Sequence, residues 1–507
     1  MASAKSHKIL SASYQKINLA PDEETSALSE LLIDISSENG DQVDSSKDAS
    51  APDGITASGM QNFKRHRELD EGINNMDLYE FGLWGEKCCI YEVPQGLRKE
   101  ENLLAYTPQY VSIGPIHHKR KDNLKTMEKL KMTYRESFET RLPEGKDSIE
   151  KYRCSLEQHE QKIRLCYSKK FDDHILEHND IEGKNQFLDI IMLDAIFIME
   201  LFIIRVIEPK QESHLPLPKP WMLSGLRKDL QLLENQLPIF VLVKLYDDFV
   251  PISLKEKCQC HCFYQLAFKY FFNPGDQFII PSYYKESKHF TDMLRYRKLP
   301  TAYKNLTYQQ EECFHKLKTA IKLDAAGITI ERQQPKQKIE FKKGKFLLSM
   351  IPWMKCFKAR FIIPPLNVDD TTELLYRNII ALEQCLYPDK PYISSYIAIL
   401  DRLIDSEEDT HFLMNKGIIN HTMGSNKEVA DLFNNLLKDV DFDYEFFGHE
   451  LNEIHEHCIN PWNNAMATLK SVYFCSVWRG SLTVVGIVVF LLSIFNSAYT
   501  FLKNINF

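Results

Sequence analysis

Four short motifs that mark large classes of enzyme are missing from this sequence of 507 residues. It contains no G-x-x-x-x-G-K-[ST] phosphate loop, no G-x-S-x-G nucleophile elbow, no H-E-x-x-H zinc motif and no G-x-G-x-x-G dinucleotide turn. Enzymes of those classes are therefore disfavoured. We expect a protein that is not an enzyme and that needs no cofactor.

Clustered positive charge is lacking as well. The formal net charge is -8, and residues 21 to 60 hold ten acids against one lysine. Three lysines precede that segment, so residues 61 to 507 carry a net charge of only -2. Nucleic-acid binding requires clustered positive charge, so no nucleic-acid partner is expected. Residues 1 to 60 are also poor in aromatic side chains, which predicts a disordered acidic tail.

The twelve cysteines are scattered and show none of the regular spacing of a disulfide framework. We therefore expect reduced thiols. The polar stretch from Met1 to Leu10 also lacks an apolar run of signal-peptide length. This favours synthesis in the cytosol and a body that stays on the cytosolic side of any membrane.

Apolar residues at helical spacing predict a mainly α protein. Ser425 and Glu428 form a capping box, and an apolar stripe with helical periodicity follows them. Asp370 and Glu373 have the same spacing at the start of a second stripe. These patterns predict a large helical globular domain over residues 61 to 475.

Three further segments complete the predicted fold. Leu188 to Val206 is apolar on nearly all sides, but its four ionisable groups favour a buried core helix over a membrane span. Leucines from Leu226 to Leu237 keep a helical period, which predicts another helix. Between about residues 327 and 368 the pattern changes to alternation, which predicts a small antiparallel sheet inserted between helical halves.

The segment from Leu482 to Leu502 contains 21 residues without a charge. At 1.5 Å per residue, such a helix spans roughly the 30 Å hydrocarbon core of a bilayer. Trp478 and Arg479 precede it in the manner of interfacial anchors, and Asn496 is its one costly polar group. We predict a transmembrane helix; the alternative is a fully buried core helix.

One cluster has the residue types of a metal site. On a continuous helix, Cys258, His261 and Cys262 would share a face and could offer soft ligands to zinc. No second Cys/His pair completes a structural site elsewhere in the sequence. The favoured interpretation is therefore that these cysteines belong to the core, with the metal site as the alternative.

Four residues could support catalysis if they lined a cleft. Asp189 and Glu200 are eleven residues apart, which returns them to the same helix face, and general acid/base chemistry is conceivable. His117 and His118 are adjacent to a run of basic residues. The favoured alternatives are that the carboxylates pair with Arg205 or with lysines, and that the histidines form a solvated basic turn.

Four segments, which occur in the same order as in a known family, carry a resemblance to that family. They are Ile90 to His118, Met127 to Lys131, Asp229 to Leu242, and Thr371 to Cys385. Together with the terminal apolar segment they resemble the plant family called domain of unknown function 247, also known as uncharacterised protein family 0481. The resemblance implies a helical body, a C-terminal membrane helix and no established catalytic activity. Similar members are implicated in grass pollen self-incompatibility, which implies a recognition or signalling role.

Within the third segment, Glu234, Asn235 and Gln236 precede Pro238. We expect these polar side chains to lie in an apolar helix and to satisfy the backbone groups that the proline leaves free.

The function expected from these features is a membrane-anchored interaction or recognition protein, with the bilayer and a protein as partners. The alternative is an enzyme of unrecognised class with a cleft that uses His117, His118, Asp189 or Glu200. Two N-x-[ST] sequons, at Asn305 and Asn420, would accept glycans only if the body were lumenal.

Overall fold

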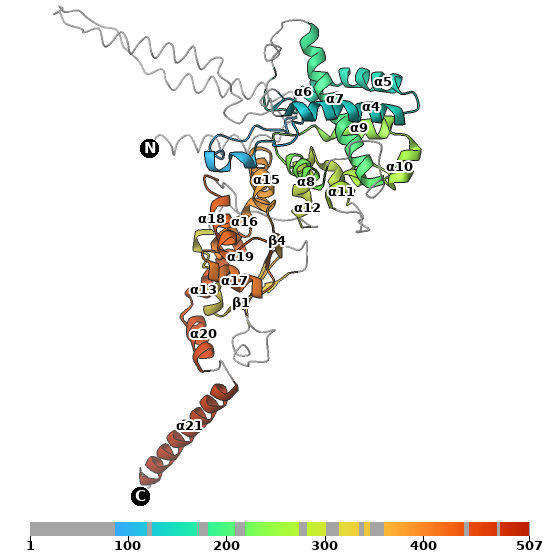
Figure 1. The fold of residues 1–507 in the computed structure, drawn as a ribbon. Coiled ribbons are helices and arrows are strands. Elements are labelled where there is room, and N and C mark those ends of the chain that lie inside the picture. Colours follow the sequence, from blue (N-terminus) through green and yellow to red (C-terminus); the bar gives the residue numbers. More distant parts are fainter. Residues whose placement is uncertain are drawn as a thin grey trace, which may run out of the picture. The chain divides into compact units, whose positions relative to one another are not determined.

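A computed structural model describes residues 87–118, 124–169, 171, 181–207, 219–272, 281–300, 314–333, 339–344, 359–440, 446–473 and 477–505 (Figure 1). All of them belong to one compact unit, residues 78–507. The predicted acidic tail, residues 1 to 60, and the sequon at Asn305 lie outside the described residues. Within the unit most elements are helices, so the predicted mainly α fold is confirmed.

Helix α7 (Ile181–Ile207) is the centre of the first group of helices. It packs against α4, α5, α9, α10 and α11, and its residues from Ala195 to Met199 are fully buried. The predicted core helix from Leu188 to Val206 is therefore confirmed. The helices of this group other than α7 are α4 (Lys125–Arg141), α5 (Lys146–Glu157), α6 (Glu160–Arg164), α8 (Pro220–Asp229), α9 (Ile239–Phe249), α10 (Ile252–Cys258), α11 (Phe263–Phe272) and α12 (Phe290–Lys298).

A second group of helices follows. Helix α18 (Asn426–Leu436) begins where the capping box predicted, because the Ser425 hydroxyl accepts a hydrogen bond from Glu428 N at 3.2 Å. Helix α15 (Thr372–Leu386) is also confirmed, although Asp369 rather than Asp370 accepts from the backbone at its start. The other helices of this group are α13 (Ala320–Ala325), α16 (Tyr392–Leu403), α17 (Glu407–Asn415), α19 (Gly448–Ile459) and α20 (Pro461–Tyr473). The described 3-10 helices are η1 (Glu100–Ala105) before α4, η4 (Ser282–Glu286) between α11 and α12, and η6 (Phe314–Lys316) before α13.

The small sheet is mixed, whereas the sequence predicted an antiparallel one. Its order is β1-β3-β2, with β1 (Ile328–Arg332) parallel to β3 (Ala359–Ile363) and β2 (Glu340–Lys342) antiparallel to β3. Strand β4 (Leu366–Val368) follows β3 in the chain but is not part of this sheet. It pairs in parallel with β5 (Ile419–His421) in a separate two-stranded sheet. Alternation of apolar residues reports which face is buried but not which strand is the neighbour, so the pairing could not be read from it.

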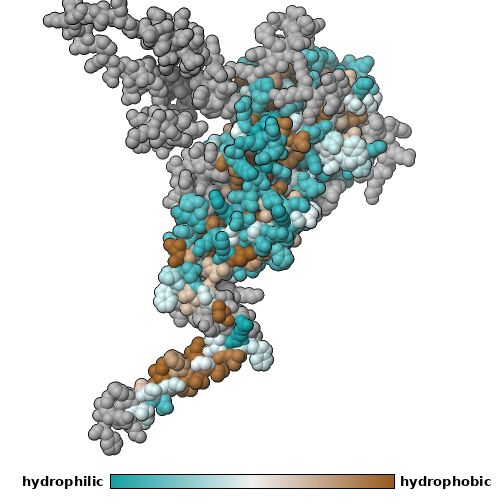
Figure 2. Space-filling view, turned by 60° about the vertical axis from the view of Figure 1, so that its left-hand side comes forward, coloured by the Kyte–Doolittle hydropathy of each residue, from teal (hydrophilic) through white to brown (hydrophobic). Residues whose placement is uncertain are grey.

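Helix α21 (Val477–Ile505) ends the described chain. Its segment Trp478–Thr500 has a mean hydropathy of 2.1. The apolar residues of this segment are not buried inside the protein. Figure 2 shows hydrophobic surface along this helix. Among the described residues it is the one helix long and apolar enough to cross a membrane, and it coincides with the predicted span from Leu482 to Leu502. The alternative of a buried core helix is wrong.

Candidate functional site

The segment from Tyr106 to His118 consists of bends, turns and irregular backbone and belongs to none of the described strands, so its backbone groups need other partners. Asp229, the last residue of α8, supplies them with its buried carboxylate. That carboxylate accepts hydrogen bonds from Gln109 N at 3.0 Å, Tyr110 N at 2.5 Å and Val111 N at 2.8 Å. A single buried carboxyl group therefore holds three consecutive residues of the first family segment against the third.

Asn235 and Gln236 add further buried hydrogen bonds to this contact. Asn235 accepts from Ile113 N at 2.7 Å and donates to Val111 O at 3.0 Å. Gln236 donates to Leu232 O at 2.7 Å and accepts from Phe290 N at 2.9 Å at the start of α12. Both side chains are fully buried with their amide groups engaged.

The helix predicted from Leu226 to Leu237 is wrong after Asp229. Helix α8 ends at Asp229, and the residues before Pro238 form a turn that leads to α9. The expectation that these side chains satisfy backbone groups freed by Pro238 inside a helix is wrong, because the segment is a turn. Gln236 instead donates to the carbonyls of Leu230 and Leu232 in this turn. Glu234, Asn235 and Gln236 also accept hydrogen bonds from backbone N–H groups of the first family segment and of α12.

Glu234 joins two more parts of the first segment. Its carboxylate accepts from Val93 N at 2.7 Å, pairs with Arg98, and lies 2.9 Å from Nε2 of His117. Burial alone would raise the pKa of the Glu234 carboxyl, but His117 and Arg98 hold that pKa below its ordinary value. The group is therefore an ionised structural acceptor at neutral pH.

Lys131 of the second family segment is fully buried on α4. Its ammonium donates to Ser112 O at 2.6 Å and pairs with Asp194 of α7 at 2.5 Å. Asp194 in turn accepts from Gly114 N at 2.8 Å. Burial would lower the pKa of Lys131, but Asp194 and Glu128 raise it above its ordinary value, so the ammonium stays charged.

The fourth family segment reaches the same network through α15. Asn378 accepts from Leu233 N at 2.8 Å and donates to Ala105 O at 2.7 Å, which links α15 to the first and third segments. One turn and a half further along α15, Glu383 pairs with Arg295 of α12 at 2.7 Å and accepts from Ser394 N at 2.7 Å. All four segments that carry the family resemblance thus meet in one buried polar network.

The chemistry of this network is structural. Its acids and amides are committed to backbone hydrogen bonds and ion pairs in the interior, where a substrate has no direct access to them. Among its members, sequence analysis identified Glu234, Asn235 and Gln236 and missed Asp229, Asp194 and Lys131. The signal that could have found them was their place inside the matching segments or, for Asp194, an acid in an otherwise apolar helix.

The four residues of the predicted cleft lie in separate environments. His117 is buried beside Glu234, and Glu200 is buried with Ser137 at 2.7 Å and Arg141 at 2.8 Å. Asp189 is half-exposed and pairs with Arg153 at 3.0 Å, so the expected pairing with Arg205 or lysines is wrong. His118 is partly exposed at the end of the first segment. The described structure does not bring these four together.

The geometry needed for the predicted metal cluster is also absent. Helix α10 ends at Cys258, and Gln259 adopts a left-handed backbone with φ of 51°, so His261 and Cys262 do not continue a helical face. Burial raises the pKa of the Cys258 thiol to about 12, which disfavours the thiolate that a metal would need. Across the described part of the chain, no group of three or more His, Cys, Asp or Glu residues is placed to hold a metal ion.

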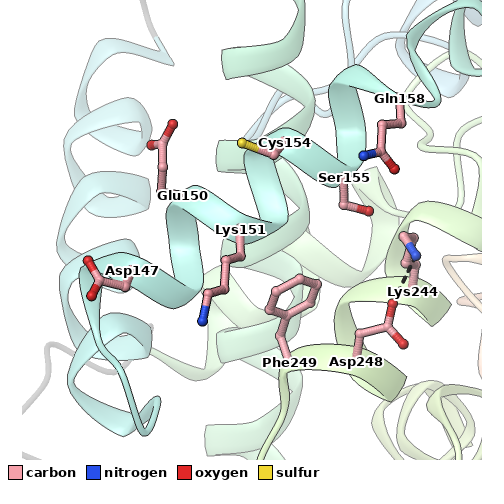
Figure 3. Close-up of a pocket in the computed structure, with 9 residues that line it drawn as sticks. All are labelled: Asp147, Glu150, Lys151, Cys154, Ser155, Gln158, Lys244, Asp248 and Phe249. Carbon is pink, nitrogen blue, oxygen red and sulfur yellow. Dashed lines mark hydrogen bonds and ion pairs between the residues drawn. The ribbon is translucent and has the colours of Figure 1, made fainter.

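An open surface groove of about 530 Å³ lies between α5 and α9 (Figure 3). In Figure 3 Phe249 faces α5, and Lys244 pairs with Asp248 at 2.9 Å. None of the predicted catalytic residues lines this groove. The residues that line it are Asp147, Glu150, Lys151, Cys154, Ser155, Gln158, Lys244, Asp248 and Phe249.

The described chain is a helical body in which these four segments meet, followed by an exposed apolar helix. The chain belongs to the domain of unknown function 247 family, whose model, described as a plant protein of unknown function, matches residues 90–492. It is similar to the UPF0481 protein At3g47200 of Arabidopsis thaliana, with 28% identity over 83% of this chain and 88% of the relative.

A second relative is the putative UPF0481 protein At3g02645 of the same plant, with 22% identity over 82% of this chain and 89% of the relative. No solved structure matches the chain significantly.

Proposed function

We propose that this protein is a membrane-tethered interaction component, in which α21 fixes a helical body to a bilayer and the body or the N-terminal tail binds another protein. The observation that carries the proposal is the exposure of Trp478–Thr500, because a helix this apolar is not stable in water without a partner. The bilayer is the partner whose dimensions fit its length.

The buried network supports a binding role over a catalytic one. Residues that carry the family resemblance hold the body together. His117 lies against Glu234, while Asp189 pairs with Arg153 and Glu200 pairs with Arg141. An enzyme that used His117, Asp189 or Glu200 in a cleft would first have to break these contacts, and His118 lies apart from both carboxylates in the described structure. The nearly neutral charge of residues 61 to 507 favours a protein over a nucleic acid as the partner.

The proposed orientation places the body in the cytosol. All nine described cysteines are free, as is usual in a reducing compartment. Lys470 and Arg479 precede the span and one lysine, Lys503, follows it, which agrees with the positive-inside rule.

Proximity labelling tests the proposal directly. A labelling enzyme would be fused to the N-terminus of the full chain and of a variant that lacks residues 482 to 507, and both would be expressed in plant cells. We expect the full chain to label a reproducible set of membrane-associated proteins that the shortened variant does not label. An identical set of labelled proteins for both variants would contradict a function that depends on the tether.

A further inference from the structure

Helix α20, which precedes the apolar helix, has large apolar side chains exposed on one side. Trp462 is 67% exposed and Val472 is 50% exposed. Ala465 is exposed on the same side, and Ile459 at the end of α19 is exposed nearby in sequence. Soluble helices turn such residues toward the core, so this surface needs an explanation.

The opposite side of α20 is the one that contacts the body. Asn463 donates to His457 O at 3.1 Å, and Asn464 donates to Cys458 O at 2.9 Å. Ala467 is buried against Gly327. A Cβ added at Gly327 would lie 3.3 Å from the Cβ of Ala467. With 3.6 residues per turn, these small and polar residues lie on a different arc of the helix from Trp462, Ala465 and Val472. The large apolar side chains of α20 therefore lie away from the part of the helix that contacts the body.

The position of α20 in the chain indicates what covers its apolar side. Trp462 is about 16 Å along the helix axis from Tyr473, and the residues that lead to Val477 add at most about 14 Å. Trp462 therefore lies within about 30 Å of Val477, the first residue of α21, whatever the angle between α20 and α21. No Asp or Glu follows Glu456, while Lys470 and Arg479 flank this region, so nothing in it repels an anionic membrane surface.

We propose that the exposed side of α20 lies in the interfacial layer of the bilayer, so that the protein contacts the membrane through an interfacial helix as well as through its span. Trp462 occupies the headgroup region, where an amphipathic ring is most stable, and Val472 reaches the acyl boundary. The body is then held close to the membrane surface and in a restricted orientation. This inference rests on the proposed anchoring by α21.

Fluorescence quenching in reconstituted full-length protein tests the contact. The chain has five tryptophans, and a variant with Trp84, Trp221, Trp353 and Trp478 changed to Phe keeps Trp462 alone. A matched variant keeps Trp221 alone, since Trp221 is 59% exposed on α8 of the body and has no adjacent span. Vesicles of phosphatidylcholine and phosphatidylserine, with or without bromine on the acyl chains, would supply a lipid quencher, and iodide would supply an aqueous one.

We expect brominated vesicles to quench Trp462 several-fold more than Trp221, and iodide to show the reverse order. Strong quenching of Trp462 by iodide would overturn the inference, because the side would then face water. Protection from both quenchers would also overturn it, because a protein, such as a second copy of this chain, would then cover the helix.

Two further measurements keep the result interpretable. Trp462→Phe in the otherwise native chain should reduce the quenching of tryptophan fluorescence by brominated lipid. This measurement does not depend on the folding of the multiply substituted variant. Extraction of the same vesicles at alkaline pH reports on the span alone. Protein that is released by this treatment would contradict the anchor, whereas retained protein with no lipid quenching of Trp462 would contradict only the interfacial helix.

Discussion

At the scale of single residues, Gly114 of the first family segment lies close to Gln236 of the third. Its φ is +71°, and a Cβ there would lie 2.6 Å from Gln236 O and 3.2 Å from the Tyr167 hydroxyl. The left-handed backbone and the contact with a carbonyl oxygen both require glycine.

Gly114→Ala should therefore lower the free energy of unfolding by about 3 kcal/mol, as expected for a strained backbone combined with a displaced neighbour. Chemical denaturation of the detergent-solubilised chain, followed by circular dichroism, measures the change. Gly96→Ala is the matched control, because a Cβ at Gly96 meets nothing within 4 Å. Equal stability of the two variants would mean that the close approach at Gly114 does not exist.

His289 should make stability depend on pH. It is fully buried at the start of α12, where its Nδ1 accepts from Asp292 N at 3.4 Å, and burial lowers its pKa to about 3. The unfolded chain takes up a proton below about pH 6.5 and the folded chain does not, so stability falls by about 1.4 kcal/mol per pH unit from about pH 6.5 toward pH 3. Burial raises the pKa of Asp292 to about 6, which adds a slope of opposite sign between about pH 4 and 6.

The comparison of His289→Asn with the unsubstituted chain isolates the histidine. Asparagine keeps an acceptor at this helix start and does not titrate, so acid should destabilise the variant less steeply. His449→Asn serves as the control, since His449 is 69% exposed. Unfolding midpoints measured at a series of pH values give the slopes. Parallel profiles for His289→Asn and the unsubstituted chain would rule out a buried neutral histidine.

At the scale of elements, α15 connects α12 to α16 through Glu383. This fully buried carboxylate pairs with Arg295 and accepts from Ile393 N at 3.1 Å and Ser394 N at 2.7 Å, so it caps the start of α16. The guanidinium of Arg295 also lies 4.0 Å above the ring of Tyr387. The contacts among α12, α15 and α16 therefore depend on the Glu383 carboxylate.

Glu383→Gln should destabilise the chain by about 3 kcal/mol, because it leaves the buried Arg295 without its counter-charge. Glu144→Gln removes an exposed acid that pairs with the exposed Lys151 and should cost less than about 0.5 kcal/mol. Denaturation midpoints of the two variants test the difference. Similar losses would show that Glu383 does not hold the helices together.

At the scale of the whole molecule, α21 should account for membrane integration. Deleting residues 482 to 507 removes most of the one described helix that is long and apolar enough to span a bilayer. We expect the shortened chain to appear in the supernatant after alkaline extraction, while a chain that lacks residues 1 to 60 stays in the membrane pellet. Retention of the shortened chain after alkaline treatment would mean that another segment crosses the membrane.

The side of the membrane that holds the body can be read from the sequons. Asn420 lies on β5 with its side chain exposed, so a folded lumenal body would present it to glycosylation. With the body in the cytosol, glycosidase should leave the gel mobility unchanged. A glycosidase-sensitive shift that disappears in the double variant Asn305→Gln, Asn420→Gln would reverse the orientation.

Sequence alone was enough for features that depend on local periodicity and composition. The core helix from Leu188 to Val206, the start of α18 at Ser425 and the apolar helix from Leu482 follow from apolar spacing and one capping pair, which act within a few turns. The contacts of the turn that contains Glu234, Asn235 and Gln236, the parallel β1–β3 pair and the packing of α20 against Gly327 were decided by tertiary structure. Each depends on a partner far along the chain, and hydrogen-bond geometry between distant segments leaves no periodic pattern in either segment.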